Sequence, residues 1–399
     1  MFYTTLALAK LTTLISKLLN IGAGSTWPGH VALRVYPNLF RDSHFRFNKG
    51  LILITGTNGK TTTAKLLSMS LRNLGNFVVT NSSGANLLNG IASAFLLQFS
   101  LTKKFDYGVF EVDEAAFPKL LEQTSPNVVF LLNISRDQLD RHWEPDLVFE
   151  RWVTALKNTT PLPYIIADSE EPKFGLMATL LDEDKITFFD KDSPLKLRSH
   201  KVFYNDKDLG SSNLAGEFNR KNLNAAAKAM ALLGFSYKDV VASLKDFSFA
   251  YGRGEKIEFK GKDFRILLAK NPKSFNTNLD DLLDPSGDAI QAFPEALLFI
   301  LNDNIPDGRD ISWIYDINPI KLKEVCKDKA VFVAGTRCFD MAVRLQYAGV
   351  FIDKANVDKE IAEVLKRLAS KTELKNVTVL PNYSSMLAFR KLVLGRSIL

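Results

Sequence analysis

Residues 51–63 read LILITGTNGKTTT, an apolar run followed by a glycine-rich turn, a lysine and three threonines. This order predicts a buried strand, a turn and the beginning of a helix. Gly56 and Gly59 let backbone N–H groups close around phosphate oxygens, and Lys60 brings a positive charge to the outer phosphates. The hydroxyl of Thr61 is suited to Mg²⁺, so the stretch predicts binding of a nucleoside triphosphate.

The spacing of this turn departs from the common pattern G-x-x-x-x-G-K-[ST], because the position five before Gly59 is Ile54. A glycine turn with a surface lysine is the alternative, but the apolar run before the turn and the hydroxyl-rich stretch after it favour a phosphate site. The residues of this stretch that we expect to contact ATP are Gly56, Thr57, Asn58, Gly59, Lys60, Thr61 and Thr62.

Length and composition point to a globular protein of two or three domains. The chain has 399 residues, of which 46% are hydrophobic, and a formal net charge of +7. That mild excess suits anionic headgroups or phosphorylated substrates, or is simply spread over the surface. Cys326 and Cys338 are too few for a disulfide framework or a four-ligand zinc site, which fits a cytoplasmic protein. No long basic run or zinc-finger signature indicates nucleic-acid binding.

The N-terminal residues 1–20 have apolar residues at helical spacing, interrupted by Lys10 and Lys17. A signal peptide needs a cleavage site after an unbroken apolar core, and a membrane-spanning helix needs about 20 apolar residues. Neither pattern is present. We expect an amphipathic helix that packs on the protein or touches a membrane surface, and no transmembrane segment.

Apolar strand-like runs alternate with helical patterns, which predicts an α/β fold with a doubly wound, mainly parallel sheet. After a helical stretch at 218–234, the glycines within 250–254 suggest a hinge, and a second series of strands follows. We expect an N-terminal helix and lead-in at 1–45, an ATP-binding domain at 46–250 and a smaller α/β domain at 251–399. The expected strands are 51–55, 77–80, 107–112, 128–133, 164–167, 264–269, 296–301, 330–334 and 376–380.

Polar motifs follow several of these strands. The sequence FEVDE ends the third strand, and its Glu111 and Glu114 join Thr61 as candidate Mg²⁺ ligands, since hard cations prefer oxygen donors. A solvated acidic turn is the alternative. The stretch 133–142 (NISRDQLDRH) follows the next strand and combines carboxylates with two arginines that can clamp a charged substrate. Its candidate substrate residues are Arg136, Asp137, Asp140 and Arg141.

Asn219 and Asn222 stand at the beginning of the helical stretch at 218–234. Taken with the motifs above, in this order, they resemble the central domain of the Mur ligase superfamily, whose members activate a carboxylate with ATP and join an amine to it. Within it, the chain is similar to the MurT family, the synthetase subunits of lipid II isoglutaminyl synthase. Further strings that carry this resemblance are 27–33, 84–86, 136–141, 268–272, 301–313 and 334–337.

The resemblance implies an activity and further site residues. It implies ATP-dependent amidation of the α-carboxyl of D-glutamate in lipid II through an acyl phosphate, with Asn219, Asn222 and Arg253 at the nucleotide and Asn86 near the substrate. MurT proteins usually carry a four-cysteine zinc ribbon, whereas the corresponding stretch, 191–216, has no cysteine. Zinc is therefore not expected. With a lipid-linked substrate, the resemblance implies a cytoplasmic protein that can associate peripherally with the inner face of the cytoplasmic membrane.

Ammonia would come from a partner. Neither cysteine stands in a glycine-flanked nucleophile turn, and the chain has only four histidines. The resemblance implies a heterodimer with a GatD-like glutaminase, in which Asp310 orients the partner's catalytic histidine. Asp307 is the alternative for that role, and both acids are also typical of a turn around Gly308.

Two other activities are compatible with the nucleotide motif. An amino-acid-adding muramyl or folylpolyglutamate ligase would use an amine in place of ammonia. A nucleotide-gated scaffold would bind ATP and a partner without catalysis. The string at 302–313 argues against the first, and an intact set of Lys60, Thr61, Glu111 and Glu114 argues against the second.

Overall fold

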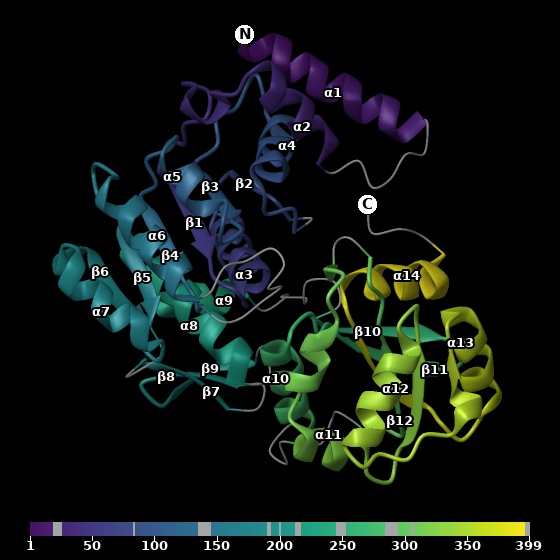
Figure 1. Ribbon diagram of the computed structural model, residues 1–399. Coiled ribbons are helices and arrows are strands. Elements are labelled where there is room, and N and C mark those ends of the chain that lie inside the picture. The colour runs from purple at the N-terminus through teal and green to yellow at the C-terminus, as the bar shows by residue number, and fades with distance from the viewer. Residues whose placement is uncertain are drawn as a thin grey trace. The chain divides into compact units, whose positions relative to one another are not determined.

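The computed structural model describes residues 1–18, 26–82, 84–134, 145–189, 193–198, 201–211, 217–244, 253–283, 294–304 and 307–395. The described residues up to 244 form one compact unit, and those from 253 onward form a second (Figure 1). The expected domain boundary at 250/251 lies outside the described residues.

The first unit is built on a six-stranded parallel sheet in the order β2-β3-β1-β4-β5-β6. Crossovers run in both directions from β1, so the expected doubly wound α/β fold is confirmed. Each polar motif of the first unit follows the carboxyl end of a strand. The strands are β1 Gly50–Thr55, β2 Val78–Thr80, β3 Tyr107–Glu111, β4 Val128–Leu131, β5 Tyr164–Asp168 and β6 Ile186–Phe189.

Helices cover both faces of this sheet because its strands are apolar on both sides. Leu51 and Leu53 of β1 belong to a core with the helices of one face, and the intervening Ile52 and Ile54 are fully buried on the other. The first face carries α1 Phe2–Leu18, α2 Trp27–Val35, α4 Leu88–Gln98, α5 Phe117–Leu121, α6 Pro145–Lys157 and α7 Pro172–Leu180, with the short turns η1 Leu39–Arg41 and η2 Glu183–Lys185 nearby.

The other face carries α3 Lys60–Asn73 and α8 Glu217–Leu232, which pack on strands and on each other, with α9 Tyr237–Ser243 beside them. Alanines 225 to 227 and 229 on α8 are fully buried and permit this close packing. An antiparallel sheet of three short strands, which the sequence patterns did not indicate, precedes α8. Its strands are β7 Leu195–Arg198, β8 Lys201–Tyr204 and β9 Lys207–Ser211.

The second unit holds another six-stranded sheet, in the order β10-β11-β15-β12-β13-β14. All neighbours are parallel except β10, an antiparallel edge strand that the sequence patterns missed. The strands are β10 Arg253–Phe259, β11 Lys262–Leu267, β12 Ala296–Ile300, β13 Ala330–Ala334, β14 Val357–Asp358 and β15 Asn376–Pro381.

Two apolar cores sandwich this second sheet. Leu297 and Phe299 of β12 face one core and Leu298 faces the other, following the period of two along a strand. The first core is covered by α10 Pro272–Leu283, α11 Pro319–Cys326 and α12 Cys338–Tyr347, with η4 Ser312–Asp316. The second is covered by α13 Ile361–Ser370 and α14 Tyr383–Leu394, and η5 Lys354–Asn356 precedes β14.

No helix in the described ranges is long and apolar enough to cross a membrane.

Two helical glycines allow a matched test of packing in the first unit. A Cβ at Gly29 of α2 would lie 1.9 Å from the backbone oxygen of Asn89 on α4, whereas a Cβ at Gly175 of α7 would meet nothing within 4 Å. Gly29→Ala is expected to lower the free energy of unfolding by about 1–3 kcal/mol. Gly175→Ala should raise it by about 0.5–1 kcal/mol, because alanine favours the helix.

Denaturant unfolding followed by circular dichroism measures both changes. Equal effects of the two substitutions would contradict the close approach of α2 to α4.

Candidate nucleotide site

The glycine-rich turn joins β1 to α3 in a conformation that requires its glycines. Gly56 has a φ of 134° and Gly59 a φ of 93°. A Cβ at Gly56 would lie 2.9 Å from the backbone nitrogen of Asn133, and a Cβ at Gly59 would lie 2.5 Å from Oδ1 of Asn222. Both space and backbone geometry therefore exclude side chains, and the turn runs close to two other segments of the first unit.

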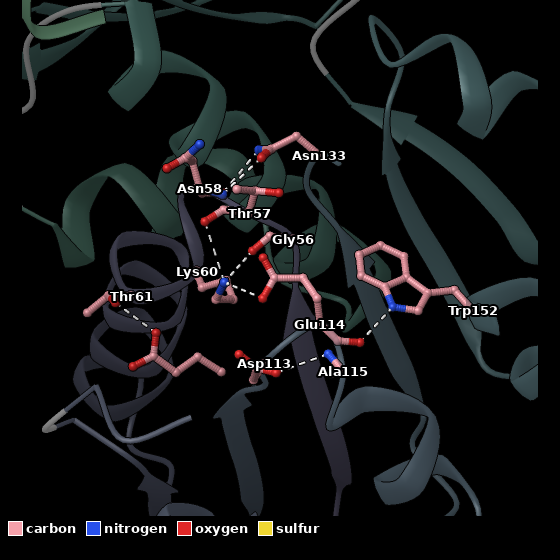
Figure 2. Close-up of polar contacts among 11 residues, drawn as sticks. Gly56, Thr57, Asn58, Lys60, Thr61, Asp113, Glu114, Ala115, Asn133 and Trp152 are labelled. Carbon is pink, nitrogen blue, oxygen red and sulfur yellow. Dashed lines mark hydrogen bonds and ion pairs between the residues drawn. The ribbon is translucent and has the colours of Figure 1, made fainter. Parts of the chain in front are cut away.

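Asn133, the second residue after β4, holds this turn in place (Figure 2). Its backbone oxygen accepts from the N–H of Thr57 at 3.0 Å. Its side chain pairs with Asn58 in both directions, accepting from the backbone N–H at 2.9 Å and donating to the backbone oxygen at 3.0 Å. The bonds are buried, so they set the path of the turn without competition from water.

Lys60 is the first residue of α3 and is only 5% exposed. Its Nζ donates to Oε2 of Glu114 at 3.1 Å and to the backbone oxygens of Gly56 and Thr57 (Figure 2). Glu114 is itself held by Trp152 of α6, whose Nε1 donates to the Glu114 backbone oxygen at 3.0 Å. The Lys60 ammonium is thus held against the backbone of the turn. A bound phosphate would compete with the Glu114 carboxylate for this ammonium.

Thr61 and Glu111 form the second polar pair of the site. The Thr61 hydroxyl donates to Oε2 of Glu111 at 2.7 Å. Asn81, after β2, holds the backbone of Glu111 from both sides, because its Oδ1 accepts from the N–H at 3.0 Å and its Nδ2 donates to the oxygen at 2.9 Å. A hydroxyl beside a carboxylate is an oxygen donor set of the kind Mg²⁺ prefers.

The three candidate metal ligands are therefore divided between two pairs. Thr61 and Glu111 lie together, while Glu114 binds Lys60. Within the described ranges no group of three or more His, Cys, Asp or Glu side chains is arranged to hold a metal ion. The Thr61–Glu111 pair accordingly fits a Mg²⁺ ion that takes most of its oxygens from phosphates and water, as Mg²⁺ commonly does.

Asn222 of α8 reaches the same turn. Asn222 is 3% exposed, and its Oδ1 accepts from the Thr63 hydroxyl at 3.2 Å. Its Nδ2 has no hydrogen-bond partner among the described residues, which costs a buried donor about 1–3 kcal/mol unless a ligand supplies an acceptor. Asn219 lies one turn earlier on α8 and is half-buried. Thr62 of α3 is buried.

The expected substrate residues are only partly within the described chain. The backbone oxygen of Asn86 accepts from the N–H of Asp113 at 2.9 Å, which places Asn86 beside the acidic turn that carries Glu111 and Glu114. Arg136, Asp137, Asp140 and Arg141 lie outside the described residues.

Arg253, Asp307 and Asp310 belong to the second unit. The backbone of Arg253 begins β10 and pairs with Leu267. Asp307 is buried, and its carboxylate accepts from the backbone N–H of Ser384 at 2.9 Å. Asp310 is exposed and lies two residues before η4, and its Oδ1 accepts from the N–H of Ser312 at 2.8 Å.

These environments shift the two pKa values in opposite directions. Burial raises the pKa of Asp307, whereas the hydrogen bond from the Ser312 N–H lowers the pKa of Asp310. Asp310 is therefore the acid that is both ionised near neutral pH and accessible from outside.

Both cysteines are buried in the second unit. Burial raises the pKa of Cys326 to about 12 and also raises that of Cys338. A nucleophilic cysteine needs an accessible, low-pKa thiolate, so neither residue is suited to glutamine hydrolysis.

Comparison with known proteins assigns both units. Residues 54–230 match the Mur ligase middle domain, and residues 268–386 match the MurT ligase C-terminal domain. The chain is 28% identical to the MurT subunit of lipid II isoglutaminyl synthase (glutamine-hydrolyzing) from Staphylococcus aureus strain COL, over 96% of both proteins. It is 25% identical to the same subunit from Streptococcus pneumoniae strain R6, over 96% of this chain and 95% of that protein.

The chain is similar to the MurT subunits over nearly its whole length and carries both of their domains. Solved structures agree with this fold. MurF from Acinetobacter baumannii matches 92% of the chain and 79% of its own length with a TM-score of 0.68 and 19% identity. Folylpolyglutamate synthase from Mycobacterium tuberculosis matches 98% of the chain and 99% of its own length with a TM-score of 0.67 and 15% identity. At these identities the likeness concerns the fold alone.

The sequence motifs identified the turn, Lys60, Thr61 and the acidic strand end of this MurT-type chain, but not the residues that support them. Asn133 and Asn81 hold the turn and Glu111 through their amides, and Trp152 holds Glu114. An amide just after the end of a strand that neighbours β1 or β3 is the one signal that could have indicated Asn133 and Asn81. Nothing in the sequence around Trp152 indicates its contact.

Asn133→Ala removes both side-chain bonds to Asn58 and leaves two buried backbone groups without them. The expected result is a rise in the dissociation constant for ATP of about tenfold to a hundredfold, because losing such bonds costs about 1–3 kcal/mol. Isothermal titration calorimetry measures it. Asn158→Ala changes an exposed asparagine after α6 and should leave the constant unchanged. Parental affinity in Asn133→Ala would show that the turn keeps its path without the clamp.

Proposed function

We propose that this protein is the ATP-dependent subunit of a lipid II isoglutaminyl synthase. It would convert the α-carboxyl of D-glutamate in the lipid II stem peptide to the amide, giving D-isoglutamine, with ammonia supplied by a GatD-like glutaminase. The observation that carries the proposal is the combination, along 96% of one chain, of the Mur ligase nucleotide turn with the MurT ligase C-terminal domain. The named relatives are ligase subunits of this synthase.

A carboxylate is a poor electrophile, and the chemistry of the site addresses this. One carboxylate oxygen attacks the γ-phosphorus of ATP and ADP leaves, which gives an acyl phosphate. Ammonia then attacks the acyl carbon, phosphate leaves and a proton is lost. Mg²⁺, held by Thr61 and Glu111, would neutralise charge on the phosphates.

The chain's own contribution is electrostatic and positional. Lys60 would contact the phosphoryl group as it transfers, since its ammonium already lies at the mouth of the turn among oxygen acceptors. Asn222 offers a buried amide donor beside Gly59. Arg253, the first residue of β10, is the further residue that would contact the nucleotide.

The supply of ammonia is assigned to a partner because both cysteines are buried and weakly acidic. Asp310 is suited to orient an imidazole on that partner, because it is exposed and its pKa is lowered. Such an aspartate fixes the tautomer of the histidine and stabilises the imidazolium. Asp307, buried and bonded to Ser384, is a support of the loop and not a group that a partner can reach.

The second unit, which carries Asp310, also has an exposed apolar face on α12. Phe339, Val343 and Tyr347 recur every four residues on α12 and are 59%, 42% and 76% exposed. Tyr315 of η4, which begins two residues after Asp310, contacts Tyr347 with ring centroids 6.5 Å apart. We call these four residues the α12 face. Exposed apolar patches of this kind mark protein interfaces, and we place the glutaminase on it.

Mass spectrometry of lipid II after incubation with ATP, glutamine and the glutaminase tests the activity. The expected product has a hydroxyl replaced by an amino group, and only when ATP is present. A gain of one amino-acid residue would identify an amino-acid-adding ligase. ATP binding without any change in lipid II would identify the scaffold.

Two substitutions separate the roles within the reaction. Asp310→Asn should lower glutamine-driven amidation by about 10³–10⁴-fold, as removal of a triad carboxylate does, yet retain amidation with added ammonium. Lys60→Ala should lower both by about 10²–10³-fold, because it removes charge stabilisation at the phosphoryl group. Initial rates with glutamine and with ammonium chloride measure the difference. If Asp310→Asn lowered the rate of amidation equally with glutamine and with ammonium, Asp310 would not act through the partner's histidine.

Tyr347→Asp tests the α12 face. The charge should weaken binding of the glutaminase at least tenfold, since a desolvated aromatic contributes strongly to an interface, and leave ammonium-driven amidation intact. Leu392→Asp, on α14 across the sheet and 44% exposed, is the control and should bind normally. Surface plasmon resonance measures both. Normal binding by Tyr347→Asp would place the partner elsewhere.

A further inference from the structure

The first 41 residues of the chain contain no aspartate or glutamate. The chain has 44 acidic residues in 399, so a segment of this length would carry four or five at the average density. The same segment carries Lys10, Lys17, Arg34 and Arg41. Its described residues form α1 and α2, whose charged side chains are all basic.

One side of α1 is fully used in packing. Phe2, Leu6 and Ala9 are buried, and the helix rests on α2 and α4 (Figure 1). The ring of Phe2 stacks on His44 and meets the edge of Phe99, which anchors the beginning of the helix. This side alone accounts for the attachment of α1 to the first unit.

The opposite side of α1 is also apolar, although it is open to solvent. Tyr3, Leu11, Leu14 and Ile15 are 59%, 51%, 56% and 45% exposed, and their spacing places them along one side of the helix. Lys10 is the exposed charge among them. We call these five residues the outer face of α1. A helix that is apolar on both sides normally has both sides buried. We therefore expect the outer face of α1 to be covered by a second apolar surface.

We propose that the outer face of α1 binds an anionic lipid bilayer. The side chains of Leu11, Leu14 and Ile15 would enter the region between headgroups and acyl chains, with Lys10 extending its ammonium to the phosphates. Charge complementarity selects this occupant, because basic side chains with no acid among them in residues 1–41 are attracted to anionic headgroups. The neighbouring α2 exposes Trp27 and Arg34 and is likewise free of acids. The inference rests on the proposed function, whose substrate is lipid-linked.

Vesicle binding by the full chain, without nucleotide or turnover, is the direct test. Sedimentation with phosphatidylglycerol vesicles should carry down the protein, and phosphatidylcholine vesicles should carry down much less. Binding should fall as sodium chloride is raised, because salt screens the attraction. Equal binding to both lipids at every salt concentration, or no binding to either, would overturn the proposal.

Substitutions locate the contact. Leu14→Asp should reduce binding to phosphatidylglycerol vesicles at least tenfold, because it removes apolar area and adds repulsion. Leu176→Asp is the matched control, since Leu176 of α7 is 59% exposed on the same unit, and it should bind normally. Lys10→Ala should reduce binding about fivefold, because it removes one basic residue from the contact. This variant replaces Leu14→Asp in the test if Leu14→Asp fails to fold. Parental binding by the α1 variants would overturn the assignment.

Amidation assays keep this inference apart from the proposed function. Leu14→Asp should amidate lipid II at the parental rate in detergent micelles and more slowly in vesicles. Two results would assign the face to a protein contact and overturn the membrane role. One is loss of amidation in both media by a variant whose free energy of unfolding equals that of the parent. The other is a change, measured by sedimentation velocity, in the complex with the glutaminase or with a second copy. Failure of the parental protein to amidate in detergent would instead refute the proposed function.

Discussion

The burial of the Lys60 ammonium among oxygen atoms is the constraint on which the nucleotide end of the first unit depends. A buried charge is costly unless it is paired and hydrogen-bonded, and Glu114 with the backbone oxygens of Gly56 and Thr57 meets that requirement. Those oxygens can surround the lysine only because the turn folds back over the beginning of α3. This path requires positive φ at Gly56 and Gly59 and the two hydrogen bonds between the Asn133 amide and the backbone of Asn58.

The same arrangement explains how the sheet contributes to the site. β1 lies between β3 and β4, so the segments that follow these strands reach the turn from either side. The last residue of β3 and the segment after it bring Glu111 and Glu114, and the segment after β4 brings Asn133. Ligands of open parallel sheets bind beyond the carboxyl ends of their strands, and here the supporting hydrogen bonds are concentrated at that edge.

The second unit has a different chemical character. Its reactive-looking groups are either buried, as the two cysteines and Asp307 are, or exposed and ionised, as Asp310 is. Two buried, weakly acidic cysteines together with an exposed aspartate and exposed aromatic side chains suit a surface that completes a site on another protein. The two units thus divide the proposed reaction between phosphoryl chemistry and the supply of nitrogen.

Prediction from the sequence was strongest where the chemistry is local. The doubly wound fold and the turn could be predicted because apolar strands, glycines and the lysine are adjacent in the chain. The assignment of Thr61, Glu111 and Glu114 to Mg²⁺ stays a prediction, and the pairing of Glu114 with Lys60 and of Glu111 with Thr61 could not be read from the sequence. The short strands β7 to β9 and the edge strand β10 were missed because polar residues interrupt their apolar pattern.

The amino-acid sequence by itself determined the turn, its charge, its hydroxyls and the lack of a suitable cysteine motif, because these depend on residue type and on neighbours in the chain. Only the tertiary structure decided which glutamate pairs with Lys60, that Asn133 and Asn222 meet the turn, and that Asp310 is accessible while Asp307 is not. These outcomes depend on contacts between residues more than 50 positions apart or on burial by distant segments, which no local pattern encodes.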